Sequence, residues 1–149
     1  MVDSRDQALA DIRELVEEHG WAIRHVLPSP ASGETAFSYT VGLSYRGWPE
    51  LIITGLPATV ADAFLRNAVD VQDENGSFDP GERSEELTES GDVVFIAVDD
   101  VLGMTATANI VGAFSALQLV WPDSAGALPW DAGYRNPIGS QPLLGPSPA

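Results

Sequence analysis

The sequence of 149 residues contains neither cysteine nor lysine. Without cysteine, the chain cannot form disulfides, thiolate nucleophiles, cysteine-ligated zinc sites or iron–sulfur clusters. Without lysine, it cannot form a Schiff base, including the usual attachment of pyridoxal phosphate, or the lysine-containing phosphate loop. The patterns Gly-x-Gly-x-x-Gly and Gly-x-Ser-x-Gly, typical of dinucleotide loops and of α/β-hydrolase nucleophiles, do not occur either. We therefore expect no cofactor.

Positive charge is also scarce. The chain has 7 basic side chains, all of them arginine, against 22 acidic ones, which gives a formal net charge of −15. Nucleic-acid binders need a basic footprint that displaces counterions, and anionic membranes attract basic surfaces, so we expect neither as a partner. An acidic domain attracts basic proteins, so a protein partner is expected to be basic. The use of arginine alone is typical of a GC-rich bacterial genome.

Long hydrophobic runs are absent as well. The longest apolar run, at residues 93–98, is far too short to span a bilayer. The first residues lack the basic and apolar segments of a secretory signal, so the sequence predicts a cytoplasmic protein. With 44% hydrophobic and 19% charged residues, the chain can bury an ordinary core. Its length predicts a single domain over residues 1–149.

Helical periodicity predicts two main helices. One spans residues 5–19, where Asp3 or Ser4 caps the start and Gly20 follows the end. The other begins at Pro57, which suits a first helical turn. The residues expected to face the core from this second helix are Val60, Ala61, Phe64, Leu65, Ala68 and Val71. Shorter helices are predicted over residues 84–89, within an acidic mobile loop at 72–91, and over residues 100–109.

Alternating apolar residues predict five strands, over residues 21–27, 37–43, 51–54, 93–98 and 116–121. The strand at 51–54 is apolar on nearly all sides and is therefore expected to be central. Short connections between most strands indicate an α+β fold. We expect a mainly antiparallel sheet or partial barrel of about five to six strands with two main helices.

The C-terminal segment is rich in Pro and Gly. We expect it to form an ordered wrap as far as Leu144, with a frayed end over residues 145–149. Its expected anchors are Leu128, Trp130, Tyr134, Ile138 and Leu143.

An incomplete calcium-loop pattern surrounds Gly76. When this glycine is aligned to the required one, oxygen-bearing side chains fall on four ligand positions. These candidate ligands are Asp73, Asn75, Asp79 and Glu82. The first ligand position holds Val71, which has no side-chain oxygen, so the pattern favours a solvated acidic loop over a cation site. We therefore expect no metal.

Acid–base candidates are few. In the strand at 21–27, His25 shares a face with Trp21 and Ile23, while Arg24 lies between Ala22 and Val26 on the other face. His25 could act as a base or could be a packed histidine with a satisfied hydrogen bond. The other acid–base candidates are Tyr39, Glu50 and Asp131, which also suit a half-buried tyrosine, a strand-end carboxylate and a turn aspartate. The serines Ser38, Ser44 and Ser115 have no histidine near them in the sequence.

Large aromatic residues occur outside periodic apolar segments. Such side chains either plug the edge of the core or line a ligand pocket or an interface. The candidate ligand-binding aromatics are Trp48, Trp121, Trp130 and Tyr134.

Several motifs resemble those of one bacterial family. They read Phe-Ser-Tyr-Thr-Val-Gly-Leu at 37–43, Pro-Glu-Leu at 49–51 and Leu-Gln-Leu-Val-Trp-Pro-Asp at 117–123. With Gly-Trp at 20–21 and the closing segments at 130–134 and 141–145, they resemble the uncharacterised family called domain of unknown function 4262. Its members usually carry His-Pro-Glu where this chain has Trp48-Pro49-Glu50, so any role of that histidine is lost here or falls to His25. The resemblance implies an ordered C-terminal tail and brings no activity.

Two functions fit these residues. The first is a small binding module that holds a small molecule or a protein partner in an aromatic-lined cleft between the sheet and the C-terminal wrap. The alternative is a cofactor-independent biosynthetic enzyme, an isomerase, cyclase or hydrolase, which needs His25 and Glu50 to converge on a shared cavity. A third role, as the acidic member of a toxin–inhibitor or regulatory pair, rests on charge alone.

Overall fold

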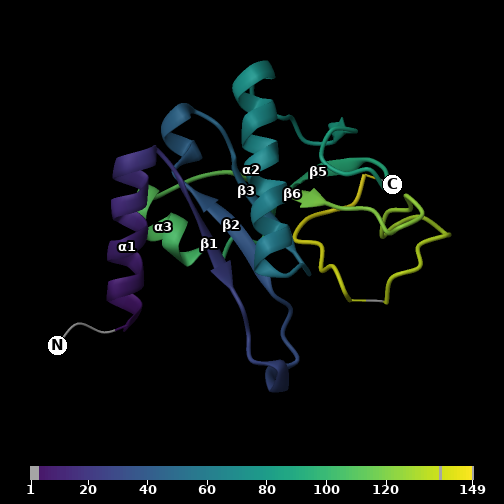
Figure 1. The fold of residues 1–149 in the computed structure, drawn as a ribbon, viewed down its shortest axis with the longest axis horizontal. Coiled ribbons are helices and arrows are strands. Elements are labelled where there is room, and N and C mark those ends of the chain that lie inside the picture. The colour runs from purple at the N-terminus through teal and green to yellow at the C-terminus, as the bar shows by residue number, and fades with distance from the viewer. Residues whose placement is uncertain (1–3, 138, 149) are drawn as a thin grey trace.

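The computed structural model describes residues 4–137 and 139–148. In this part of the chain the elements follow the order α1-β1-β2-β3-α2-β4-β5-α3-β6 (Figure 1). The helices are α1 (Ser4–His19), α2 (Ala58–Asn75) and α3 (Thr105–Val111). The strands are β1 (Ala22–Val26), β2 (Phe37–Val41), β3 (Glu50–Thr54), β4 (Arg83–Ser84), β5 (Val93–Ala97) and β6 (Ala116–Val120). Two 3-10 turns are η1 (Pro30–Ser32) and η2 (Leu43–Arg46).

The six strands form one open mixed sheet in the order β1-β2-β3-β6-β5-β4. All neighbouring pairs are antiparallel except β3 and β6, which run parallel with Leu51 opposite Leu117. The α+β class, the mainly antiparallel sheet and the central position of β3 are therefore confirmed. The partial barrel is wrong, because β1 and β4 are separate edges of an open sheet.

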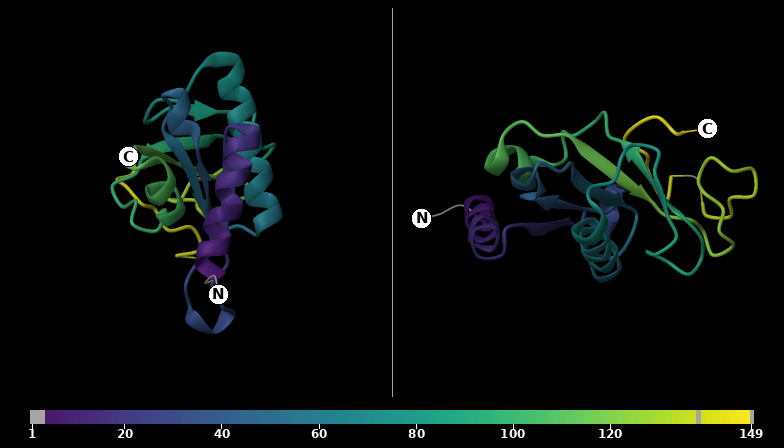
Figure 2. Two further views of the ribbon diagram at one scale, coloured as in Figure 1. Left: turned by 90° about the vertical axis from the view of Figure 1, so that its left-hand side faces the viewer. Right: turned by 90° about the horizontal axis from the view of Figure 1, so that it is seen from above.

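One face of the sheet is covered by α2 (Figure 2). Successive side chains of a strand point to opposite faces, and on this face the buried side chains of β3, β5 and β6 meet the buried face of α2. Leu65 and Ala68 from the helix pack there against Leu51, Phe95 and Leu119. At the far end of α2, Phe78 stacks on Phe95 with ring centroids 3.9 Å apart.

The other face carries two separate clusters. Toward β1 and β2, the helices α1 and α3 cover Tyr39 and Val41, with Ile12 of α1 and Met104 among the buried residues. Toward β5 and β6, the chain after β6 supplies the cover, including Leu128 and the partly buried Trp130 and Leu143. Buried Gln118 links these regions, since its side chain donates to Pro142 O and accepts from Leu144 N.

Three local predictions were wrong. No helix forms over residues 84–89, because Arg83 and Ser84 pair with β5 instead. A helix would also have placed the like charges of Glu85 and Glu89 one turn apart, which is destabilising. Val60 does not face the core, since 41% of its surface is exposed. The second strand ends at Val41 rather than 43, because the chain turns into η2.

No helix in the described ranges is long and apolar enough to cross a membrane. The proposed cap Asp3 and the proposed anchor Ile138 lie outside the described residues.

Candidate functional site

Glu50, at the start of β3, has no exposed surface. Its carboxylate accepts hydrogen bonds from the backbone amides of Gly42, Leu43 and Ser44 over 2.9–3.2 Å, and from Thr40 Oγ1 at 2.7 Å. The Ser44 hydroxyl donates a fifth bond. Because its acceptor capacity is filled by the chain itself, this side chain holds the turn between β2 and β3 and has no free lone pair to offer a substrate.

His25 is part of an arrangement that spans three elements. Its Nδ1 lies 2.6 Å from Ser38 Oγ on β2, and its Nε2 lies 3.5 Å from an Asp62 carboxylate oxygen on α2. The other Asp62 oxygen accepts a hydrogen bond from Arg66 Nε at 2.6 Å. This order of hydroxyl, imidazole and carboxylate is that of a catalytic triad. Ser38, however, is only 1% exposed, so its hydroxyl has no access to a substrate in this conformation.

The remaining acid–base candidates lie elsewhere. Tyr39 is buried on the opposite face of the sheet, where its hydroxyl accepts a hydrogen bond from Ala106 N at 3.0 Å. Asp131 shapes a turn by accepting from Leu128 N at 2.9 Å. The structure therefore places the four acid–base candidates in four environments and brings no two of them together.

Three of the four candidate aromatics fill the edges of two different clusters. Trp48 and Trp121 pack against the cluster under α2, and Trp121 Nε1 donates to Thr54 O at 2.8 Å. Trp130 packs against the cluster that contains Leu128 on the opposite face. The Tyr134 hydroxyl accepts from the side chain of Asn136. These positions suit plugs of the core edge, and the aromatics do not line one common cleft.

The acidic segment near Gly76 is not arranged as a cation loop. Asp73 and Asn75 belong to α2, which continues through Asn75, and Asp73 forms an ion pair with Arg46 at 2.9 Å. Asp79 and Glu82 are joined by a bond from the Asp79 amide to the Glu82 carboxylate. Across the described ranges, no three His, Asp or Glu side chains are grouped so that they could hold a metal ion.

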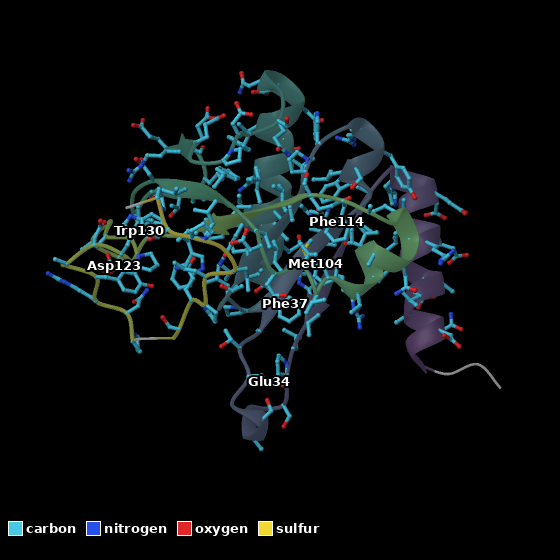
Figure 3. All side chains as sticks on the ribbon, turned by 180° about the vertical axis from the view of Figure 1, so that it is seen from behind. Glu34, Phe37, Met104, Phe114, Asp123 and Trp130 are labelled. Atoms are coloured by element: carbon cyan, nitrogen blue, oxygen red, sulfur yellow. The ribbon has the colours of Figure 1, made fainter. Side chains whose placement is uncertain are left out.

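Asp123 organises the chain after β6. Its Oδ1 accepts from the amides of Ala125 and Ala127, and its Oδ2 accepts from the amide of Arg135 at 2.8 Å (Figure 3). The amide of Arg135 is the main cause that lowers the pKa of the Asp123 carboxyl below its ordinary value of 3.8. Sequence reasoning noted Asp123 only as part of a family motif, since its partners are up to twelve positions away.

A first cavity of about 340 Å³ lies on the face opposite α2. Its wall combines the loop before β2, the ends of β2 and β3, the segment before α3 and the C-terminal segment. The lining residues are Gly33, Glu34, Thr35, Phe37, Ile52, Thr54, Asp100, Gly103, Met104, Pro142 and Leu144. Phe37 and Met104 lie close together in Figure 3, and Glu34 lies beyond them on the loop between β1 and β2. Among the described residues of this lining, Glu34 and Asp100 are the only charged ones, and both are exposed and lie at the mouth.

A second cavity, of about 440 Å³, lies beside the first, between α1, β1 and α3. Its lining residues are Ala8, Leu9, Ile12, Arg24, Val26, Phe37, Gly103, Thr105, Ala106 and Asn109. Arg24 is the only charged residue among them. Phe37 and Gly103 line both cavities, and a Cβ built on Gly103 would lie 3.2 Å from the tip of the Phe37 ring. Phe37 and Gly103 therefore lie where the two cavities adjoin, and we call this pair the partition.

The protein is therefore an α+β domain with an open sheet. The sheet carries two adjoining cavities on the face opposite α2, the longest of the described helices. The family model described as Domain of unknown function (DUF4262) matches residues 15–135, so the chain belongs to this family. This confirms the family resemblance. Searches of the curated proteins and of the solved structures gave no match.

Most residues that line the two cavities were not among the site residues predicted from the sequence. Arg24 did leave a signal, because the alternation of β1 places it between Ala22 and Val26 on an otherwise apolar face. Met104 and Gly103 left none, since they meet Phe37 across more than sixty residues of chain. Only the tertiary fold defines this site.

Proposed function

We propose that this protein is a binding domain that holds a small molecule with an apolar body in the first cavity. The observation that carries the proposal is the cavity itself, which has Phe37, Ile52, Met104 and Leu144 in its wall and polar groups at its mouth. Concave sites with mainly apolar walls and a few oriented polar groups are typical of small-molecule sites.

The C-terminal segment supplies one wall of the proposed site. Pro142 O accepts hydrogen bonds from Thr54 Oγ1 at 2.9 Å and from Gln118 Nε2 at 2.8 Å. Leu144 O accepts from the amides of Asp99 and Asp100. These bonds attach the segment to β3, β6 and the loop after β5, and they support our proposal that it is an ordered wrap that closes the site.

An enzymatic function is the second candidate, because Ser38, His25 and Asp62 have the order of a nucleophile, a base and an orienting carboxylate. Burial of Ser38 argues against it. A fluorophosphonate probe separates the two candidates: covalent labelling of Ser38 in the folded protein would support the hydrolase, and an unlabelled Ser38 supports the binding domain.

The binding proposal is tested with a thermal-shift and native mass-spectrometry screen of the full chain against small amphipathic molecules. A ligand that binds only the native state stabilises it by about 2.7 kcal/mol at a hundredfold excess over Kd. Thr35→Trp places a large ring in the wall of the first cavity and is expected to weaken binding at least tenfold. Leu27→Trp, at an exposed position outside the cavity lining, is the matched control.

A hit that is lost in the Thr35 variant and kept in the Leu27 variant supports the proposal. A hit that both variants bind equally places the site elsewhere and contradicts it. A screen without hits contradicts it as well.

A further inference from the structure

We infer that the two cavities form one bipolar groove, and that its ligand is an elongated molecule with an amino group at one end and a carboxylate at the other. This inference rests on the proposed function and adds the chemical class of the ligand. It is carried by the partition that the cavities share and by the opposite signs of charge in their linings.

Arg24 defines the anionic end of the ligand. Arg24 is partly buried, whereas Arg13, Arg66, Arg83 and Arg135 are exposed. Arg46, Arg66 and Arg83 each pair with an aspartate, whereas Arg24 makes no ion pair or side-chain hydrogen bond with the described residues. A guanidinium that loses part of its hydration on burial is stabilised by an anionic partner. Here it lies in a chain with 22 acidic side chains, and none of the described residues that line its cavity carries a carboxylate. A ligand carboxylate would satisfy it through a bidentate pair.

Glu34 and Asp100 define the cationic end. They are the only charged residues among the described lining of the first cavity, and neither forms an ion pair with another described residue. One Asp100 oxygen accepts from Leu102 N at 3.1 Å, which orients the carboxylate and leaves the second oxygen free of hydrogen bonds from the described residues. A ligand ammonium at the mouth would lie near both carboxylates and would still be partly hydrated.

Phe37 sets the shape of the groove. It lies opposite Val26 in the sheet, two residues along β1 from Arg24, and Glu34 precedes it by three residues. At about 3.3 Å per extended residue, the two charged ends are separated by roughly 15 Å along the backbone. The ring is only partly buried, and the inference requires it to move aside at Gly103 for a ligand that occupies both cavities. The ligand body is therefore a chain or narrow ring system that passes beneath the phenyl group.

Isothermal titration of the full chain tests the inference with ligands of graded length. The probes are the ω-amino acids from 6-aminohexanoate to 12-aminododecanoate, with the alkylamine and the alkanol of equal chain length as controls. We expect affinity to rise with length, and the best ω-amino acid to bind at least tenfold more tightly than the alkylamine. Arg24→Gln should remove that advantage and leave alkylamine binding unchanged, and Arg24→Lys should restore part of it.

Two matched variants complete the design. Arg13→Gln removes an exposed arginine of α1 that lines neither cavity, and it should leave the ω-amino acid advantage nearly unchanged. Glu34→Gln combined with Asp100→Asn should weaken the alkylamine and the ω-amino acid by a similar factor, about fivefold at low salt, and less at high salt. The melting temperature of each variant shows whether it is folded.

The outcomes separate the two proposals. If alkylamine or alkanol binds and the ω-amino acid gains nothing over it, the bipolar groove is wrong and the binding function stands. The same holds if the gain survives Arg24→Gln in a folded protein. If no member of the three series binds, both the groove and the first cavity as a site for such ligands are wrong.

Discussion

Replacing Glu50 by glutamine tests whether one buried carboxylate holds the connection between β2 and β3. The two side chains have nearly the same size, so the change alters charge and hydrogen bonding with little change in packing. Glutamine offers one carbonyl oxygen and one NH₂ group to a site where three backbone amides and two hydroxyls donate. The hydroxyls of Thr40 and Ser44 can rotate to accept from the new NH₂ group, but the amides cannot.

The magnitude follows from these contacts. In its better orientation the glutamine NH₂ group takes the place of Oε1, which leaves the amide of Leu43 without an acceptor. A buried amide without a partner costs about 1–3 kcal/mol. The remaining bonds change from charged to neutral acceptors, which are weaker by about 1 kcal/mol each. Relief from burying a charge offsets part of this loss. We expect a net loss of about 3 kcal/mol in the free energy of unfolding.

Urea unfolding followed by circular dichroism measures this loss. At about 2–4 °C per kcal/mol for a chain of this size, the melting temperature should fall by roughly 10 °C. Glu86→Gln is the matched control, because Glu86 is exposed, and it should change stability by less than about 0.5 kcal/mol. If Glu50→Gln is within 1 kcal/mol of the wild type, the carboxylate does not hold the turn and our reasoning about its five donors is refuted.

Three further predictions concern other parts of the molecule. Ser38→Ala removes the hydroxyl bonded to His25 and should lower the free energy of unfolding by about 1 kcal/mol in urea titrations; a variant as stable as wild type would show that the bond contributes nothing. The pKa of Asp123 is lowered in the folded state, so its ionised carboxylate stabilises the fold above pH 3.8, and this stabilisation is lost as the pH falls through the folded-state value. The melting temperature of the wild type should therefore fall more between pH 5 and pH 3 than that of Asp123→Asn. Parallel pH profiles for the two proteins would contradict this. Gly55 has a positive φ of 85°, and Gly55→Ala places a Cβ against the carbonyl oxygen of Ser140. The variant should therefore have a lower melting temperature and weaker ligand binding in the first cavity. Unchanged binding would show that the C-terminal wall is not required.

Much of the fold followed from local patterns. The alternation in residues 37–43 predicted β2, because a strand places successive side chains on opposite faces. The continuous apolar run at 51–54 predicted β3 as a central strand, because such a strand is buried on both faces. The failures come from contacts with residues outside the local segment. The acidic residues at 85–89 have acceptable helix propensities, but pairing of Ser84 with Val93 overrides them. The end of β2 depends on Glu50, a long-range acceptor that no local pattern reveals.

The candidate site was harder to predict for a physical reason. His25 was proposed either as a base or as a packed histidine with a satisfied hydrogen bond, but Ser38 and Asp62 belong to other elements and become its neighbours only in the folded sheet. Cavities arise where packing is incomplete, and incomplete packing is a property of the assembled elements rather than of any segment. An apolar residue such as Met104 therefore reads as core in the sequence, although it also lines a wall.

The single parallel pairing of the sheet has a consequence for folding kinetics. Strands β1 to β3 are joined by short connections and can associate as a local antiparallel meander. Pairing of β3 with β6 instead joins Leu51 to Leu117 and closes a loop that contains α2, β4, β5 and α3. Contacts of such large sequence separation carry a high loop-closure entropy and slow the folding of a chain. The meander should therefore form before β6 docks, and the cavities, which need residues from both ends of the chain, should be completed in the last step.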